Sequence, residues 1–303
     1  MKFFLFADLH HFPNVLMTGT WDDLRLLQRR AEEEGCEFMI HAGDFCHGPS
    51  KVEEYVRAYN DFCVPSYHAL GNHDTDHTDY EEVLRLYNMP NGYYHFDRSG
   101  YRMIVTDTNY YYVNGEYIHY NLGNYYANGA YRDYVPPEQL QWLEKTIAES
   151  PYPCILISHA SFERKADGVK NQEEVRRIIN EANRRKKHSV ILCINGHHHR
   201  DYIRILDGVC YWDMNSVCYD WLPIKHNNFP EELCQKYRCM RNVVIYNDPL
   251  CAVVTVEGTT ITIEGTESTM FMGINREHTD NPVCDASGRE VVPRVQSAKI
   301  TLG

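Results

Sequence analysis

Short apolar runs alternate with amphipathic stretches through the first two thirds of the chain, and most of these runs stop abruptly at polar residues. The apolar runs predict buried strands, and apolar residues at helical spacing predict helices between them. This strand–helix alternation favours βαβ units with parallel pairing and right-handed crossovers. The expected strands cover about 2–7, 38–40, 64–70, 155–157 and 190–194, and the expected helices about 21–34, 52–59, 79–87, 137–147 and 172–183.

Three of these helices have recognisable start signals. Thr20 with Asp23, and Ser50 with Glu53, have the spacing of a capping box. The dipeptide at 136–137 is Pro-Pro, and proline is well suited to the first turn of a helix.

The remaining pattern is mostly β in character. Hairpins are predicted at 93–106 and, around Asp207-Gly208, at 202–212. Further strands are expected at 243–246, 252–256 and 260–263.

Two segments lack a clear pattern. Residues 108–134 are rich in tyrosine and predict a long loop, either a substrate lid or a packing or dimer contact. The apolar pattern thins after Gly265, so we expect one domain over 1–265 and an extension over 266–303 with a strand near 290–295.

Composition narrows the possible partners and location. The formal net charge is −12, which argues against nucleic acid as a partner but not against one small phosphate ester held by metal ions. Eleven cysteines are scattered along the chain and predict reduced thiols in a cytoplasmic protein. No stretch has a signal-peptide pattern or approaches the ~20 apolar residues of a membrane helix.

Five of the apolar runs are followed by clusters of acidic, amide and imidazole side chains. If these strands pair in one sheet, the side chains converge on its carboxyl-end rim, where α/β sheets bind ligands. Each cluster alone could be an ordinary turn, but five together favour a site. Mixed nitrogen and oxygen ligands suit Mn, Fe, Zn or Co, and their number suggests two ions sharing a carboxylate. The clusters contain Asp8, His10, Asp44, Asn72, His73, Asp74, His159, His197 and His199.

The order of these motifs resembles the calcineurin-like metallophosphoesterase superfamily. The motifs are Asp-x-His at 8–10, Gly-Asp at 43–44, Gly-Asn-His-Asp at 71–74, the lone His159 and Gly-His-x-His at 196–199. The resemblance implies an α/β or α+β fold, a two-sheet mixed β sandwich flanked by helices in four αββα layers. It also implies a centre of two divalent or trivalent transition-metal ions, Mn, Fe or Zn.

The resemblance assigns a role to each motif residue. Asp44 would bridge the two ions, and a water ionised by them would attack phosphorus. His73 would protonate the leaving oxygen and Asp74 would orient His73, while His11 and His198 would be neighbours rather than ligands. One ion would be held by Asp8, His10, Asp44 and His199, and the other by Asp44, Asn72, His159 and His197.

We therefore expect a metal-dependent phosphoester hydrolase, most similar to the small phosphodiesterases for cyclic nucleotides and glycerophosphodiesters. His47 stands where purple acid phosphatases have a tyrosine ligand, and His73 stands where lipid A precursor pyrophosphatases have arginine. The Asp-Arg-Gly of Ser/Thr protein phosphatases is absent after Asp44. Alternatives are a phosphomonoesterase, a nuclease or a non-catalytic scaffold. Arg164 and Lys165 could contact phosphate or form a solvated turn.

Overall fold

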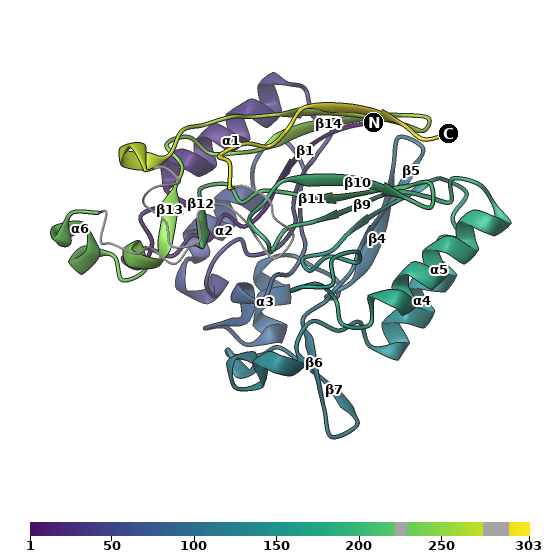
Figure 1. Cartoon of the computed structure of the whole chain (residues 1–303), viewed down its shortest axis with the longest axis horizontal. Helices are drawn as coiled ribbons and strands as arrows, with labels where there is room; N and C mark the ends of the chain where they lie inside the picture. Colours follow the sequence, from purple (N-terminus) through teal and green to yellow (C-terminus); the bar gives the residue numbers. More distant parts are fainter. Residues whose placement is uncertain (222–228, 275–290) are drawn as a thin grey trace.

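Two six-stranded sheets pack face to face, with helices on both outer sides (Figure 1). The structure is a computed structural model that describes residues 1–221, 229–274 and 291–303. The first sheet has the order β16-β15-β14-β1-β2-β3, and the second has the order β10-β11-β9-β8-β5-β4. The two-sheet sandwich with flanking helices expected from the sequence is confirmed.

In the first sheet, β1, β2 and β3 are parallel, and β14 to β16 are added antiparallel. In the second sheet, β5, β8, β9 and β11 run parallel, and β4 and β10 lie antiparallel at the edges. The strands are β1 (Lys2–Phe6), β2 (Met39–His41), β3 (Ser66–His68), β4 (Tyr94–Arg98), β5 (Tyr101–Val105), β8 (Cys154–Ile157), β9 (Val190–Asn195), β10 (Tyr202–Leu206), β11 (Val209–Asp213), β14 (Ala252–Glu257), β15 (Thr260–Gly265) and β16 (Ala298–Thr301).

Successive side chains on the strands of the second sheet point to its two opposite faces, and each face packs against a different layer. Met103 and Ile155 face the first sheet and share its core, whereas Ile104 and Leu156 face the opposite side. That opposite side packs on α4 (Pro137–Ala148) and α5 (Gln172–Arg185), whose apolar residues belong to the same cluster. The helices α1 (Trp21–Glu33) and α2 (Glu53–Asn60) bury their apolar faces in the core of the first sheet. The result is the predicted αββα arrangement.

Smaller elements complete the described part of the chain. None of the helices among the described residues combines the length and the apolar composition that crossing a bilayer requires. The smaller elements are α3 (Tyr80–Leu86), α6 (Glu231–Lys236), the strand pairs β6 (Tyr110–Val113) with β7 (Glu116–His119) and β12 (Tyr219–Trp221) with β13 (Val243–Ile245), and the 3₁₀ turns Pro49–Lys51, His73–Thr75, Asn124–Tyr131, Met240–Asn242 and Phe271–Gly273.

The helix starts are partly as expected. Thr20 and Asp23 form a reciprocal capping box before α1, and Pro137 occupies the first turn of α4. The second predicted box is wrong, because α2 begins after Val52 and the hydroxyl of Ser50 bonds Thr78 instead.

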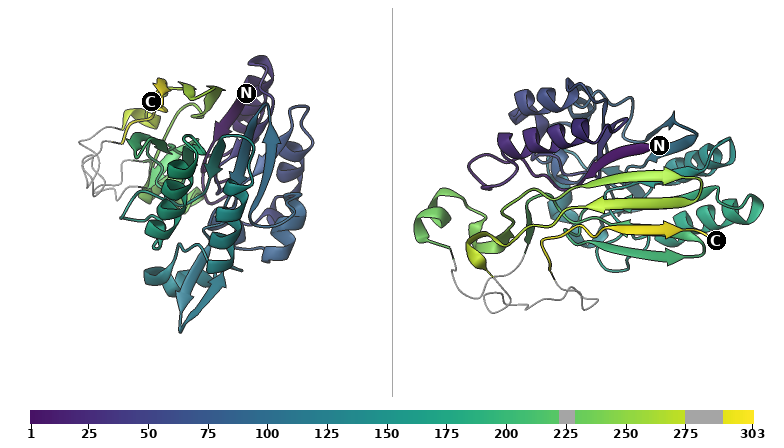
Figure 2. Two further views of the ribbon diagram at one scale, coloured as in Figure 1. Left: turned by 90° about the vertical axis from the view of Figure 1, so that its right-hand side faces the viewer. Right: turned by 90° about the horizontal axis from the view of Figure 1, so that it is seen from above.

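The tyrosine-rich segment is more ordered than predicted. Residues 108–134 contain the hairpin β6–β7 and a 3₁₀ turn rather than an irregular loop, and the hairpin projects from the lower end of the body (Figure 2, left). In the tail, the strand lies at Ala298–Thr301 rather than near 290–295, and residue 290 lies outside the described residues. This strand pairs with β15 at the edge of the first sheet (Figure 2, right). The division of the chain at residue 265 stays a prediction.

Candidate metal centre

The five motifs meet where the carboxyl ends of strands from both sheets face one another. Asp8, Asp44 and Asn72 follow β1, β2 and β3 of the first sheet. His159 and His197 follow β8 and β9 of the second sheet. The five strands do not all pair in one sheet, the condition under which convergence was argued, and the site is shared between two facing sheets.

One group of ligand atoms comes from the first and last motifs. His10 Nε2 lies 3.2 Å from His199 Nε2, and His199 Nε2 lies 3.4 Å from Asp8 Oδ1. The backbone N–H of His197 donates to both carboxylate oxygens of Asp8, at 3.1 and 3.0 Å. Asp8, His10 and His199 form one buried cluster of suitable metal-ligand atoms.

A second group lies beside the first. His159 Nε2 lies 3.2 Å from Asn72 Oδ1 and 3.2 Å from His197 Nδ1. Asp44, His159 and His197 also form a cluster that could hold an ion.

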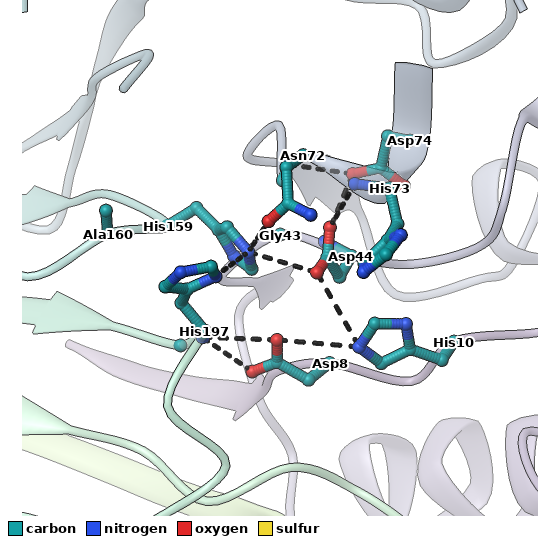
Figure 3. A network of polar contacts seen from close by, with 12 residues as sticks. Asp8, His10, Gly43, Asp44, Asn72, His73, Asp74, His159, Ala160 and His197 are labelled. Carbon is teal, nitrogen blue, oxygen red and sulfur yellow. Dashed lines mark hydrogen bonds and ion pairs between the residues drawn. The ribbon is translucent and has the colours of Figure 1, made fainter. Parts of the chain in front are cut away.

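Asp44 lies between the two groups. Its Oδ2 is 3.1 Å from His159 Nε2 in one group and 3.6 Å from His10 Nε2 in the other (Figure 3). Its Oδ1 accepts the backbone N–H of His73 at 2.8 Å. A single carboxylate facing both sets of imidazoles is the arrangement that a bridging ligand requires.

Hydrogen bonds on the outer sides of the imidazoles test whether this donor set fits metal ions. His159 Nδ1 lies 2.8 Å from the carbonyl of Ala42, and His199 Nδ1 lies 2.9 Å from the carbonyl of Tyr219. A carbonyl only accepts, so each Nδ1 carries a proton, and loss of the second proton from Nε2 to a bound metal ion would leave a lone pair directed inward. Lone pairs and carboxylate oxygens that face one another at about 3 Å repel unless a cation lies between them, so this donor set fits metal ions.

The electrostatics lead to the same conclusion. Burial opposes a charge on His159, but the carboxylate of Asp44 outweighs it and raises the pKa of His159 to about 10. Burial likewise opposes the charge on Asp8, yet His199 and His10 hold the pKa of that carboxyl well below its usual range. The carboxylates of Asp8 and Asp44 thus give the centre negative charge, which favours the binding of cations.

The backbone is strained at these positions. Five of the seven predicted ligands have left-handed φ angles, which non-glycine residues rarely adopt. Such strain costs roughly 1–3 kcal/mol per residue and is concentrated at functional sites. The five are Asp8 (53°), His10 (50°), Asp44 (51°), His197 (71°) and His199 (52°).

A family model described as calcineurin-like phosphoesterase matches residues 1–201, a range that contains all five motifs. The chain belongs to the calcineurin-like phosphoesterase family. Among curated proteins, none matches the sequence.

The solved structures that are similar to this calcineurin-like chain share little sequence identity with it. A dimetal phosphatase from Danio rerio superposes with a TM-score of 0.64 at 13% identity, covering 100% of this chain and 99% of that chain. A phosphopantetheinyl hydrolase from Mycobacterium tuberculosis gives a TM-score of 0.45 at 11% identity, covering 71% of this chain and 89% of that chain. The first similarity shows that the two proteins share a fold.

Three glycines of the calcineurin-like motifs have no room for a side chain, because atoms of another motif lie close to them. A Cβ atom at Gly71 would lie 2.2 Å from Asp44 Oδ1 and 2.3 Å from the Asp44 backbone nitrogen. A Cβ at Gly43 would lie 2.3 Å from His159 Nδ1, and one at Gly196 would lie 2.5 Å from Asp8 Oδ2. Each motif glycine therefore makes room for a candidate ligand from another motif.

Gly71→Ala should displace the Asp44 carboxylate. We expect a loss of metal content together with a loss of about 1–3 kcal/mol in the free energy of unfolding, because the added methyl overpacks the site. Elemental analysis and denaturant unfolding measure the two effects. Gly208→Ala is the control for metal content, since nothing lies within 4 Å of that position; its left-handed φ of 77° should itself lower the stability of that variant. Unchanged metal content in Gly71→Ala would contradict the steric account.

The imidazole of His73 is oriented by a carboxylate that the sequence analysis did not select. His73 Nδ1 lies 2.7 Å from Asp76 Oδ2, which also lies 3.2 Å from His47 Nδ1. His47 Nε2 in turn lies 2.9 Å from Nδ1 of His10. Asp76 therefore holds His73 directly and is linked to His10 through His47.

The prediction that Asp74 orients His73 is wrong, because the Asp74 carboxylate points into the protein. Its Oδ2 accepts the backbone N–H groups of Gly71 and Asp44, at 2.8 and 3.1 Å. Its Oδ1 accepts the N–H of Cys46 at 3.2 Å and the hydroxyl of Tyr87 at 2.6 Å. Asp74 thus joins the second and third motifs and positions Asp44.

Asp74→Ala should behave as a structural change rather than as the loss of a proton donor. Four buried donors would lose their acceptor, and we expect a cost of about 3 kcal/mol or more in the free energy of unfolding. Residual turnover should fall by the same factor for good and poor leaving groups. Denaturant unfolding and a leaving-group series measure this. A loss confined to poor leaving groups would restore Asp74 as a partner of His73.

Two other residues that the sequence analysis considered, His11 and Arg164, lie outside the metal centre. His11 stacks on Tyr55 at 3.6 Å between ring centroids and bonds the carbonyl of Gly19, consistent with a neighbour of the ligands. Arg164 is buried and pairs with Asp213 at 3.6 Å, so it does not belong to a solvated turn.

Sequence reasoning did not select Asp76, gave His47 no role at the centre, and considered Tyr125 and Tyr126 only as part of the possible lid over 108–134. The hydroxyl of Tyr125 donates to Asp76 Oδ1 at 2.6 Å, and that of Tyr126 donates to Asp76 Oδ2 at 3.1 Å. The three-residue interval between His73 and Asp76 was the available signal.

Proposed function

We propose that this calcineurin-like phosphoesterase is a dinuclear metal-dependent phosphodiesterase that hydrolyses a small phosphate ester. The observation that supports it most is the position of Asp44, whose carboxylate faces both groups of ligand atoms. Asp8, His10, Asp44 and His199 would hold one ion, and Asp44, Asn72, His159 and His197 would hold the other. Mn, Fe and Zn all suit these ligands.

When bound, the two ions would supply positive charge to the phosphate oxygens and lower the pKa of water toward neutrality. The protein must then protonate the oxygen that leaves phosphorus. His73 is suited to this, because Asp76 accepts from Nδ1 and leaves Nε2 available as the donor. Burial opposes the charge on His73, but Asp44 and Asp76 raise its pKa above the usual value, which favours the protonated acid.

The alternatives have weaker support. A nuclease needs a basic track for the backbone, whereas the net charge is −12. A non-catalytic scaffold would not need a complete ligand set, and here all five motifs retain theirs. A cytoplasmic location stays a prediction.

A panel of esters assayed with Mn²⁺ tests the proposal. The panel pairs bis(p-nitrophenyl) phosphate with p-nitrophenyl phosphate, and cyclic nucleotides with the corresponding nucleoside monophosphates. We expect higher kcat/KM for the diesters. Preference for the monoesters would identify a phosphomonoesterase, and hydrolysis of neither class with Mn, Fe or Zn would contradict the proposal.

A further inference from the structure

Three tyrosines in and before the 3₁₀ turn Asn124–Tyr131 form a stack that ends beside His73. The ring centroids of Tyr120 and Tyr125 are 4.5 Å apart with 26° between their planes. Those of Tyr125 and Tyr126 are 4.4 Å apart with 28° between their planes. Tyr120 and Tyr125 are fully buried, whereas Tyr126 is 60% exposed. The last ring of the stack is therefore its exposed end, and it packs on Tyr125.

The exposed ring is held by the same carboxylate that orients His73. The hydroxyl of Tyr126 donates to Asp76 Oδ2 at 3.1 Å and lies 3.3 Å from His73 Nδ1. The hydroxyl of Tyr125 donates to Asp76 Oδ1 at 2.6 Å and lies 3.2 Å from Asn72 Nδ2. An exposed tyrosine anchored at both its face and its hydroxyl is preorganised, so a ring that stacks on it costs little conformational entropy.

The surroundings favour a ligand that is both planar and anionic. The guanidinium of Arg132 lies 5.6 Å from the ring centroid of Tyr125 and pairs with Asp133 Oδ2 at 3.7 Å, so it is a partly neutralised cation beside the stack. Leu122 and Tyr131, in the same segment, are more than half exposed. Aromatic faces beside a cation are the features that bind nucleobases next to phosphate.

We propose that Tyr126 stacks on a planar aromatic ring of the leaving group, such as the base of a nucleoside whose ester oxygen is protonated by His73. The inference rests on the proposed function, because it takes the phosphate to lie at the metal centre and the leaving group on the His73 side. It narrows the substrate to phosphate esters of nucleosides or similar ring-bearing alcohols.

Binding of two non-hydrolysable phosphonates tests the stack independently of turnover. The first is the methylene phosphonate of adenosine 5′-phosphate, and the second is that of ribose 5-phosphate, which lacks the base. Isothermal titration of the metal-loaded full chain should give at least about tenfold tighter binding of the adenosine compound. Tyr126→Ala should remove this preference without changing metal content, and Tyr126→Phe should keep most of it because the ring remains.

The control is Tyr112→Ala, which removes a partly exposed tyrosine of β6 that packs on Tyr117 and Tyr134. It should leave the preference for the base unchanged. Equal affinity of the wild type for both phosphonates, or a preference that survives Tyr126→Ala, would overturn the proposal. So would a dimer, seen by light scattering, that Tyr126→Ala dissociates without changing binding. Absence of turnover for every ester would contradict the proposed function instead. The binding data would still show whether Tyr126 stacks on the base.

Discussion

Asp44→Asn is expected to abolish hydrolysis and to reduce the metal content of the purified protein. The substitution keeps the size of the side chain and an oxygen that accepts the N–H of His73. It removes the negative charge that faces His159 and His10. Loss of that charge should cost on the order of 10³-fold in kcat, comparable to removal of a main electrostatic group from an active site.

The controls for Asp44→Asn separate a lost ligand from a lost fold. Asp61→Asn, at the exposed C-terminal end of α2, changes the same charge away from the centre and should leave activity and metal content unchanged. Circular dichroism should be the same for all three proteins. Turnover and metal content close to wild type in Asp44→Asn would remove Asp44 as the bridging ligand.

His73→Ala is expected to keep the metal ions and to lose most turnover. The imidazole contributes proton transfer to the leaving oxygen, an effect worth roughly 10²–10⁴-fold. The loss should be largest for alkyl esters and small for p-nitrophenyl esters, because nitrophenolate leaves without a proton. Asp76→Asn should give a smaller loss with the same dependence on the leaving group, since Asp76 holds His73 in place.

A nearby histidine provides the matched control for this prediction. His77 is exposed and lies four residues after His73, so His77→Ala should have wild-type kinetics. Loss of metal ions in His73→Ala would place His73 among the ligands. An equal loss for all leaving groups would contradict its role as the proton donor.

Most of the ligand set could be predicted because each motif follows an apolar run of its own. Those runs do not say which sheet each strand enters, since that choice depends on long-range packing of one sheet against the other. The apolar pattern alone therefore does not bring Asp44 to His159; the family resemblance placed both at one ion, and the structure shows that they meet across two sheets.

The partner of His73 was missed because its local backbone was not predicted. Residues His73–Thr75 form a 3₁₀ turn, in which side chains three residues apart lie on the same side. This brings Asp76 to His73 and turns Asp74 toward the core. A sequence alone does not distinguish this turn from one in which adjacent residues meet.

The tyrosine-rich segment contains a sequence signal for its hairpin that the sequence analysis did not use. Asn114-Gly115 separates β6 from β7, and both residues have positive φ angles, 53° and 89°. Asn-Gly is the preferred pair for a two-residue hairpin turn. The density of tyrosine around it obscured the alternation that identifies strands.

The central claim is that this chain binds two metal ions and needs them for hydrolysis. Elemental analysis of the purified protein, combined with hydrolysis of bis(p-nitrophenyl) phosphate before and after chelation, tests it most directly. We predict two transition-metal ions per chain, loss of activity on chelation and recovery on addition of Mn²⁺. Full activity in protein that contains no transition metal would contradict the claim.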